Sequence, residues 1–192
     1  MHTPIVLIGP MAAGKSTIAD LLSKKLDIPR FEVDEHRWTY YAAQGYDNLK
    51  GEEIYKTQGI NGLIKHWKPY EAETVVRVLA DQPNSTIDFG AGHSVYDDAT
   101  LFAKVEAALA PLPNVILLLP SPDLDESVRI CNERFSSVLE GEDIEPDADT
   151  LQLNEHFVKH PSNVRLAKMT IYTKGKTPEE TVDEIIGKLV AQ

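Results

Sequence analysis

Short apolar runs alternate along the chain with longer segments in which apolar residues recur every three or four positions. The short runs predict buried strands, at 4–9, 30–34, 85–90, 114–120 and 169–173. The longer segments predict helices, at 15–26, 51–67, 69–81, 98–110, 121–135 and 177–191. Pro69 suits the first turn of one predicted helix, and Thr177 is a typical cap for the last.

The order of these elements predicts the fold class. Strands that alternate with helices form parallel sheets with helices on both faces. We therefore expect one domain, residues 1–192, built as a three-layer α/β/α sandwich around a five-stranded parallel sheet. In such sheets the ligand binds at the carboxyl ends of the strands. The segments that matter most for function are then 9–17, 32–38, 88–97, 120–124 and 173–176.

One segment, 139–157, does not follow the alternation. It is acidic, with six Asp and Glu residues between Glu140 and Asp149. One interpretation is a solvated loop. The other is a lid over the site, because long loops in compact domains are often lids. The sequence leaves both interpretations open.

The most specific motif lies where the first strand meets the first helix. The segment GPMAAGKS fits the pattern G-x-x-x-x-G-K-[ST] without a mismatch. In such a loop the N–H groups bind phosphate oxygens, Lys15 bridges the terminal phosphates, and Ser16 offers a hydroxyl to Mg²⁺. A plain glycine turn would give no reason for Lys15 and Ser16. We therefore predict ATP and Mg²⁺ as cofactors, with the nucleotide bound by Gly9, Ala12, Ala13, Gly14, Lys15, Ser16 and Thr17.

Other features narrow the class of nucleotide-binding protein. The sequence has no N-K-x-D motif for guanine recognition, and 192 residues are few for a large ATPase module. The formal net charge of −11 disfavours a nucleic-acid partner. A small kinase that phosphorylates a second, small substrate remains, with no obligate protein partner evident.

The composition also indicates the cellular compartment and argues against a membrane-spanning segment. No apolar run approaches the ~20 residues of a membrane helix, and the first residues do not resemble a signal peptide. Cys131 is the single cysteine, which favours a reducing compartment, and we expect a cytoplasmic protein. The pattern favours a buried bystander thiol at Cys131 over a catalytic one.

Three segments together resemble shikimate kinase and its relatives. Residues 5–35, IVLIGPMAAGKSTIADLLSKKLDIPRFEVDE, are similar to the start of that family. TIDFGAGHSV (86–95) is similar to its third strand and glycine turn, and VKHPSNVRLAKMTIYT (158–173) to its post-lid helix and fifth strand. The resemblance spans nearly the whole chain, although only the phosphate loop is specific by itself. It implies an ATP-dependent kinase that phosphorylates a hydroxyl group of a small metabolite.

The resemblance implies roles for acidic residues at the strand ends. Asp34 matches the position that binds the acceptor hydroxyl and accepts its proton; the residues alone also allow a helix cap. Glu32 stands where the family has a Mg²⁺-linked aspartate. Asp88 ends the third predicted strand, where a carboxylate faces Mg²⁺, although it could instead cap the following turn.

A glycine turn and several basic residues complete the implied site. Residues Gly90, Ala91 and Gly92 match the family's acceptor-binding turn, and His93 follows as a substrate contact or a polar loop residue. Arg134 matches a catalytic lid arginine and Arg129 an adenine-stacking one; both could equally be solvated. Lys159 matches a substrate-binding arginine, while Arg165 could take that role instead or contact the nucleotide.

The acceptor is expected to differ from shikimate. The family binds its acceptor's carboxylate through an arginine in an aromatic–Arg-x-x-Glu context, which counting places near Pro69 and Tyr70, where no arginine lies. The cluster HRWTYY (36–41) supplies either an aromatic wall for the acceptor or ordinary core packing. Two alternatives to a metabolite kinase remain: a nucleoside or nucleotide kinase, and a nucleotide-binding regulatory protein without turnover.

Overall fold

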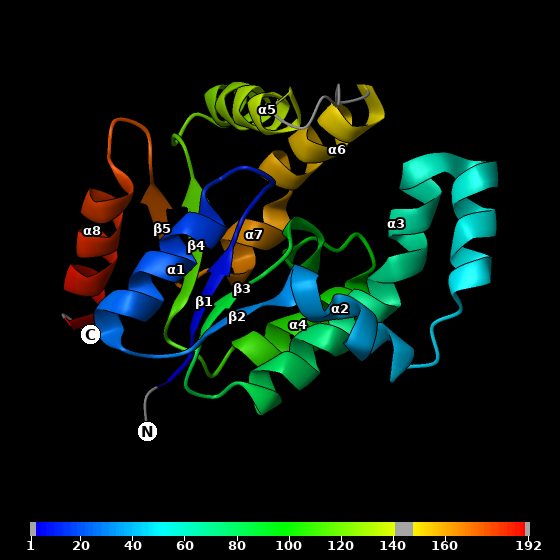
Figure 1. Cartoon of the computed structure of the whole chain (residues 1–192), viewed down its shortest axis with the longest axis horizontal. Coiled ribbons are helices and arrows are strands. Elements are labelled where there is room, and N and C mark those ends of the chain that lie inside the picture. The colour runs from blue at the N-terminus through cyan, green and yellow to red at the C-terminus, as the bar shows by residue number, and fades with distance from the viewer. Residues whose placement is uncertain (1–2, 141–147, 191–192) are drawn as a thin grey trace.

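The computed structural model describes residues 3–140 and 148–190, and its centre is a parallel sheet (Figure 1). The strands are β1 (Ile5–Ile8), β2 (Arg30–Glu32), β3 (Thr86–Asp88), β4 (Val115–Leu119) and β5 (Met169–Tyr172). Every strand pairing is parallel, and the order across the sheet is β2-β3-β1-β4-β5. The predicted α/β class and the five-stranded parallel sheet are confirmed.

Helices follow the strands in the predicted alternation. They are α1 (Lys15–Leu26), α2 (Val33–Ala42), α3 (Asn48–Asp81), the 3₁₀ helix η1 (Ala91–Ser94), α4 (Ala99–Leu109), α5 (Leu124–Glu140), α6 (Ala148–Lys159), α7 (Pro161–Leu166) and α8 (Pro178–Val190). Figure 1 shows α1 and α8 on one side of the sheet and α3, α4 and α7 on the other.

Each face of the sheet has its own apolar cluster. Side chains alternate along a strand, so β1 places Val6 and Ile8 in one cluster and Ile5 and Leu7 in the other. The first cluster includes residues of α3, α4 and α7, and the second includes residues of α1 and α8. Because both faces are covered, the strands read as unbroken apolar runs rather than as alternating patterns.

Two predicted boundaries are corrected by the structure. The sequence predicts two helices that meet at Pro69, but α3 continues through Pro69 and breaks at Gly59, where φ is 66° and ψ is −165°. Glycine adopts this conformation without a steric penalty. The strand predicted for 30–34 ends at Glu32, and Asp34 lies in the first turn of α2.

The acidic segment 139–157 is described only in part, since residues 141–147 lie outside the described residues. Its described ends belong to the helices α5 and α6, and Asn154 and Phe157 of α6 are buried. The plain loop interpretation therefore does not hold for 148–157, while the lid role stays a prediction. Within the described residues, every helix is too short or too polar to cross a membrane.

Candidate active site

The loop between β1 and α1 has backbone conformations that suit its small residues. Gly9, Ala12 and Gly14 have φ values of 141°, 57° and 96°. At Gly9 a Cβ atom would lie 2.5 Å from the Leu118 carbonyl oxygen. Glycine therefore lets the chain leave β1 in close contact with β4 and turn toward α1.

This loop delivers the amino-terminal end of α1 to the carboxyl end of the sheet. Gly14 is the N-cap, no side chain caps the helix, and its first turn holds no acidic residue. Such a helix start attracts anions through its N–H groups and dipole. Lys15 is nearly buried, and its Nζ donates to the Pro10 carbonyl oxygen at 2.9 Å. The ammonium group thus lies over the loop, which fits the phosphates of a nucleotide.

Asp88, at the end of β3, faces the phosphate loop. Its carboxylate lies close to the Ser16 hydroxyl and to Lys15. The residue is 3% exposed. Burial raises the pKa of Asp88 above its usual value, although Lys15, Ser16 and Arg30 oppose the shift. A hydroxyl beside a buried carboxylate is a donor set that suits Mg²⁺, so these two predicted metal residues fit the ion.

Glu32, the third predicted metal residue, lies opposite Asp88 in the register of β2 and β3. Arg30 forms an ion pair with Glu32, and its guanidinium lies 3.5 Å from the Asp88 carboxylate. Burial raises the pKa of Glu32, Arg30 lowers it, and the charge of Asp88 raises it further. Glu32 is thus beside the predicted metal position but already neutralised by Arg30.

Asp34 lies against the glycine turn that follows β3. A Cβ atom on Gly90 would sit 2.2 Å from Asp34 Oδ1. Arg37, one turn later on α2, approaches the same oxygen to 3.5 Å. Half of the Asp34 side chain remains exposed, so the carboxylate can meet a ligand. The structure therefore brings together two residues that the sequence predicted for the acceptor.

An ion pair on α3 completes this side of the site. Its cation, Lys68, is one of the lysines nearest to the position of the family's arginine, whereas its glutamate was missed in the sequence. Glu71 is 4% exposed, and a Cβ atom on Gly92 would lie 2.4 Å from Glu71 Oε1. Lys68 Nζ donates to Glu71 Oε2 at 2.7 Å and to the Gly92 carbonyl oxygen at 2.8 Å. The signal was present as Trp67-Lys-Pro-Tyr-Glu71, an aromatic residue followed by a cation and a glutamate three positions later. The position predicted from the sequence, near Pro69 and Tyr70, is one to two residues too late.

Two buried polar side chains beside this ion pair have unpaired atoms. Both ring nitrogens of His93 and the hydroxyl of Tyr41 are buried without a hydrogen-bond partner. Burial lowers the pKa of His93, while Glu71 raises it. Burial also raises the pKa of Tyr41, and the Glu71 charge adds to that shift. The imidazole and phenol are therefore neutral groups that can hydrogen bond to uncharged hydroxyls.

The aromatic cluster predicted at 36–41 divides into two parts. Tyr41 is fully buried and packs with Trp38 and Tyr46, and α3 adds Trp67. Tyr40 instead faces Phe31 and donates to Asp81, with burial as the main cause that raises its pKa to about 12. Trp38 is 45% exposed. Core packing thus describes Tyr41, and the wall interpretation stays possible only for the exposed Trp38.

The basic residues predicted from the lid region lie apart from the Asp34–Gly90 contact. Lys159 pairs with Asp125 and Glu155, each at 2.7 Å. Arg129 pairs with Glu133 on the exposed face of α5, where Arg134 is also exposed. Arg165 stacks on Phe102 and pairs with Glu106. The structure therefore does not bring Lys159 or Arg165 to the acceptor side, and the roles of Arg129 and Arg134 stay predictions.

Cys131 matches the bystander interpretation. It is fully buried in the apolar cluster beneath α1 and α8. Burial raises the pKa of its thiol to about 11. A protonated, buried thiol is a poor nucleophile.

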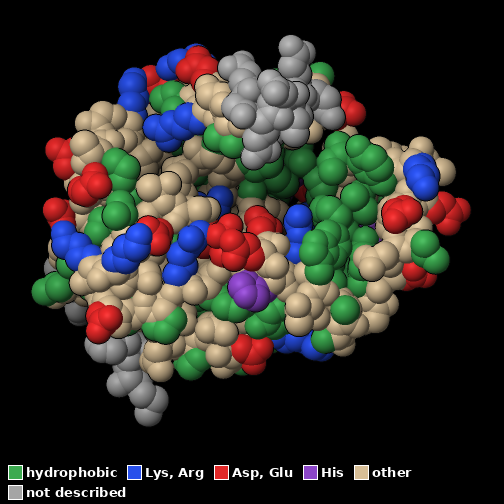
Figure 2. Space-filling model, viewed as in Figure 1, with side chains coloured by type: hydrophobic (Ala, Val, Ile, Leu, Met, Phe, Trp, Pro, Cys, Tyr) green, Lys and Arg blue, Asp and Glu red, His purple; other side chains and the backbone are tan. Residues whose placement is uncertain are grey.

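A cleft of about 670 Å³ opens beside the acceptor-side ion pair. It lies between α3, the segment after η1, and α6, with Lys68, Tyr96 and Phe157 in its wall. Lys68 Nζ lies over the rings of Tyr96 and Phe157, at 5.2 and 5.8 Å from their centroids. Figure 2 shows the molecule hollowed on its viewed face, with acidic and basic side chains beside the opening and apolar side chains at its α3 side.

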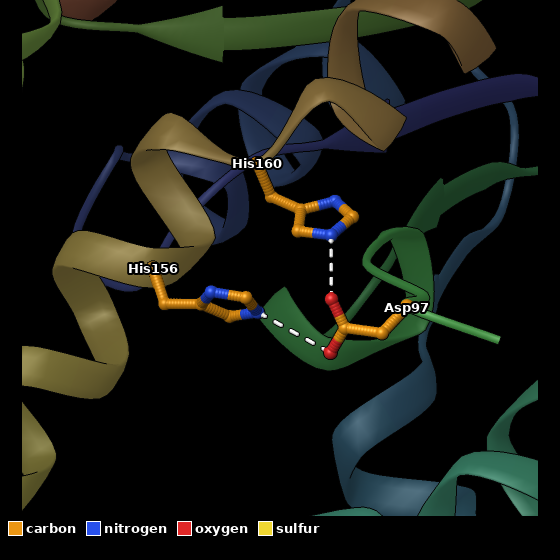
Figure 3. A group of neighbouring side chains, drawn as sticks. All are labelled: Asp97, His156 and His160. Carbon is orange, nitrogen blue, oxygen red and sulfur yellow. Dashed lines mark hydrogen bonds and ion pairs between the residues drawn. The ribbon is translucent and has the colours of Figure 1, made fainter.

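A group of Asp97, His156 and His160 lies at the edge of this cleft (Figure 3). His160 Nε2 lies 3.1 Å from Asp97 Oδ1, and His156 Nε2 lies 3.9 Å from Oδ2. Such a set resembles a metal site. The Ser162 N–H, however, donates to His160 Nδ1, so the neutral ring carries its proton on Nε2 and donates it to Asp97. The hydrogen bond from His160 to Asp97 therefore links the junction of α6 and α7 to the segment after η1, and the group is not preformed for a metal ion.

The chain has similar proteins among known sequences. It is 33% identical to the shikimate kinase of Aquifex aeolicus over 100 residues. This match covers 52% of this chain and about half, 53%, of that enzyme. It is 24% identical over 187 residues to the shikimate kinase of Persephonella marina, covering 96% of this chain and 98% of that enzyme. No model of a protein family matches the chain.

Solved structures share the fold over nearly the whole chain. A shikimate kinase from Acinetobacter baumannii in complex with shikimate superposes with a TM-score of 0.69 at 18% identity, covering 100% of this chain and 94% of that one. A gluconokinase from Sinorhizobium meliloti superposes with a TM-score of 0.55 at 13% identity, covering 98% of this chain and 92% of that one. At these identities the likeness shows the fold alone. In sequence and in fold, the chain resembles the shikimate kinase-like family of P-loop kinases.

Proposed function

We propose that this protein is an ATP-dependent phosphotransferase that moves the γ-phosphate to a hydroxyl group of a small metabolite. The single observation that carries the proposal is the end of β3. Asp88 contacts Ser16 of the phosphate loop, and two residues later Gly90 lies against the Asp34 carboxylate. One strand end thus joins a site for nucleotide and metal to a site for a hydroxyl.

The chain's own residues have distinct tasks in this proposal. Bound ATP with Mg²⁺ supplies the phosphoryl group and neutralises part of its charge. The loop N–H groups and Lys15 bind the phosphates, and Ser16 with Asp88 would hold the metal ion. Asp34 orients the acceptor hydroxyl and accepts its proton. Because phosphoryl transfer depends mainly on positioning and electrostatic stabilisation, the position of this carboxylate matters more than its basicity.

The charges on the acceptor side favour an acceptor that is less anionic than shikimate. Arg37 pairs with Asp34, and Lys68 pairs with Glu71, so these two pairs carry no net charge. Lys159, which matches the family's substrate-binding arginine, does not lie on this side and pairs with Asp125 and Glu155. On this side the buried side-chain atoms without a hydrogen-bond partner are Arg37 Nε, the Tyr41 hydroxyl and both ring nitrogens of His93. The neutral imidazole of His93 suits hydroxyls of a polyol or a sugar-like compound.

The test is ADP release from MgATP in the presence of a panel of hydroxylated metabolites that includes shikimate, gluconate and neutral sugars. We expect at least one compound to stimulate ADP release in the natural protein and none to do so in Lys15→Met. Nucleosides in the same panel test the alternative acceptor class. If no compound raises ADP release above the Lys15→Met level, the chain binds nucleotide without this activity and the proposal fails.

A further inference from the structure

The segment formed by α6 and α7, residues 148–166, contains two buried asparagines that the sequence reasoning did not single out. Asn154 is fully buried and Asn163 is 2% exposed. Asparagine is mostly found at the surface, and a buried amide requires partners for its donors and its acceptor. The partners of these two amides lie in different parts of the site.

Asn154 is bonded to the phosphate loop. Its Oδ1 accepts from the Met11 N–H at 3.0 Å, and its Nδ2 donates to the Met11 carbonyl oxygen at 3.5 Å. The same Nδ2 donates to Asn132 Oδ1 on α5 at 2.9 Å. One side chain therefore engages both backbone groups of a loop residue and is itself oriented by a neighbouring helix. Met11 lies in the middle of the loop, four residues before Lys15.

Asn163 is bonded to the turn on the acceptor side. Its Oδ1 accepts from the Ser94 hydroxyl at 2.7 Å, and its Nδ2 donates to the Phe157 carbonyl oxygen at 2.7 Å. Ser94 is the last residue of η1, which carries Gly92 and His93. This amide therefore links η1 to the carboxyl-terminal part of α6.

We propose that Asn154 and Asn163 are positioning residues that fix the two halves of the site separately, Asn154 the phosphate loop and Asn163 the acceptor turn. The proposal that η1 belongs to an acceptor site rests on the proposed function, whereas the nucleotide half requires only that the loop binds ATP. Neither amide contacts the reacting atoms in this proposal. Each acts by holding a backbone segment in the geometry that binds its ligand.

The expected effects follow from the hydrogen-bonding groups that each truncation leaves without a partner. Asn154→Ala removes the acceptor of the Met11 N–H and a donor to its carbonyl oxygen, so the loop loses its link to α6. Asn163→Ala removes the acceptor of the Ser94 hydroxyl and leaves the Phe157 carbonyl without its donor. Small displacements in such segments reduce binding or rate by roughly tenfold to a hundredfold. The two truncations remove the same side chain from equally buried positions, so each is a matched control for the other.

The experiment measures hydrogen exchange in the free protein and the affinity for fluorescent methylanthraniloyl-ATP with Mg²⁺. Neither readout needs turnover, so failure of the proposed function would not conceal the result. For Asn154→Ala we expect faster exchange in residues 9–17, unchanged exchange in 91–95, and about tenfold weaker nucleotide binding. For Asn163→Ala we expect faster exchange in residues 91–95, unchanged exchange in 9–17, and near-normal nucleotide affinity. Once an acceptor is known, Asn163→Ala should raise its KM.

Two milder variants keep the proposal testable if an alanine variant does not fold. Asn132→Ala removes only the support of the Asn154 amide and should weaken nucleotide binding in the same direction. Ser94→Ala removes the hydroxyl bonded to Asn163 and should leave nucleotide binding unchanged. Equal acceleration of exchange in both segments by either asparagine variant, or unchanged exchange in both, would overturn the proposal.

Discussion

The Asp34 carboxylate occupies the space that a side chain at position 90 would need. An ideal Cβ on Gly90 would lie 2.2 Å from Asp34 Oδ1 and 2.6 Å from its Cγ. Gly90 has an ordinary backbone φ of −60°, so conformational freedom is not the reason for glycine here. The reason is the close approach of a carboxylate from the first turn of the neighbouring helix α2.

This contact predicts that Gly90→Ala separates catalysis from nucleotide binding. The added methyl group must push Asp34 away from the acceptor turn, and a displacement of about 1 Å can reduce the rate about 10²-fold. The affinity for methylanthraniloyl-ATP should stay unchanged. Gly187→Ala is the matched control, because no atom lies within 4 Å of its added Cβ. Full activity of Gly90→Ala would show that the position of Asp34 does not matter for transfer.

A second prediction concerns Lys15. Replacing its ammonium by the methionine side chain removes the charge that stabilises the transferring phosphoryl group, so Lys15→Met should reduce turnover at least ~10²-fold. The circular dichroism spectrum should stay unchanged, because the hydrogen bond that Lys15 makes among the described residues stays within its own loop, to the Pro10 carbonyl oxygen. Lys24→Met on the exposed face of α1 is the control, since Lys24 forms a surface ion pair with Asp20. Near-normal turnover in Lys15→Met would contradict the proposal that this protein is a kinase.

A third prediction concerns Asp88 and the metal ion. Asp88→Asn should raise the Mg²⁺ concentration for half-maximal activity about tenfold or more, because the amide lacks the charge. Burial has raised the pKa of Asp88, so folding opposes its charged form at neutral pH. The neutral amide should therefore leave the melting temperature equal or higher. A Mg²⁺ titration that matches the natural protein's would assign Asp88 to capping the turn after β3.

The sheet and the phosphate loop could be read from the sequence because both are local signals. Apolar runs that alternate with helical periods specify a covered parallel sheet, and the loop motif lies within eight consecutive residues. The remaining parts of the site depend on long-range contacts. Asn154 meets Met11 across 143 positions and Asn163 meets Ser94 across 69, and no periodicity marks such a pair. Helix α2 also escaped prediction, because its aromatic and charged residues form no clear apolar stripe.

A fourth prediction uses the buried His93. Burial lowers its pKa in the folded protein, whereas in the unfolded chain it titrates near pH ~6.5. Below that pH the unfolded state binds more protons, so the free energy of unfolding falls as the pH decreases. We expect His93→Gln to reduce this loss between pH 7.5 and 5.5, in urea titrations that include the natural protein at each pH.

Other titratable groups also contribute to the pH dependence of the free energy of unfolding. The contribution of His93 is therefore obtained by comparing variants. His156 has a lowered pKa and acts in the same direction, whereas Asp88 and Glu32 have raised values and act in the opposite one. His156→Gln serves as the control, and its smaller burial should make its effect smaller. If the pH dependence of stability is identical in His93→Gln and the natural protein, His93 does not stay neutral on folding.

The last prediction concerns the charge of the acceptor, and shikimate with its methyl ester forms a matched pair for it. The two compounds carry the same ring hydroxyls and differ only in the carboxylate. In this protein the cations Arg37, Lys68 and Lys159 each pair with a carboxylate of the chain, and lysine lacks the two-pronged geometry with which arginine binds carboxylates. An acceptor carboxylate would have to displace an existing partner, so we expect the neutral ester to be used at least as efficiently as shikimate. Steady-state kinetics at saturating ATP give kcat/KM for both. A value for shikimate near ~10⁴ M⁻¹s⁻¹ or more, well above that for the ester, would contradict the prediction, because Lys68 would then bind the carboxylate despite Glu71.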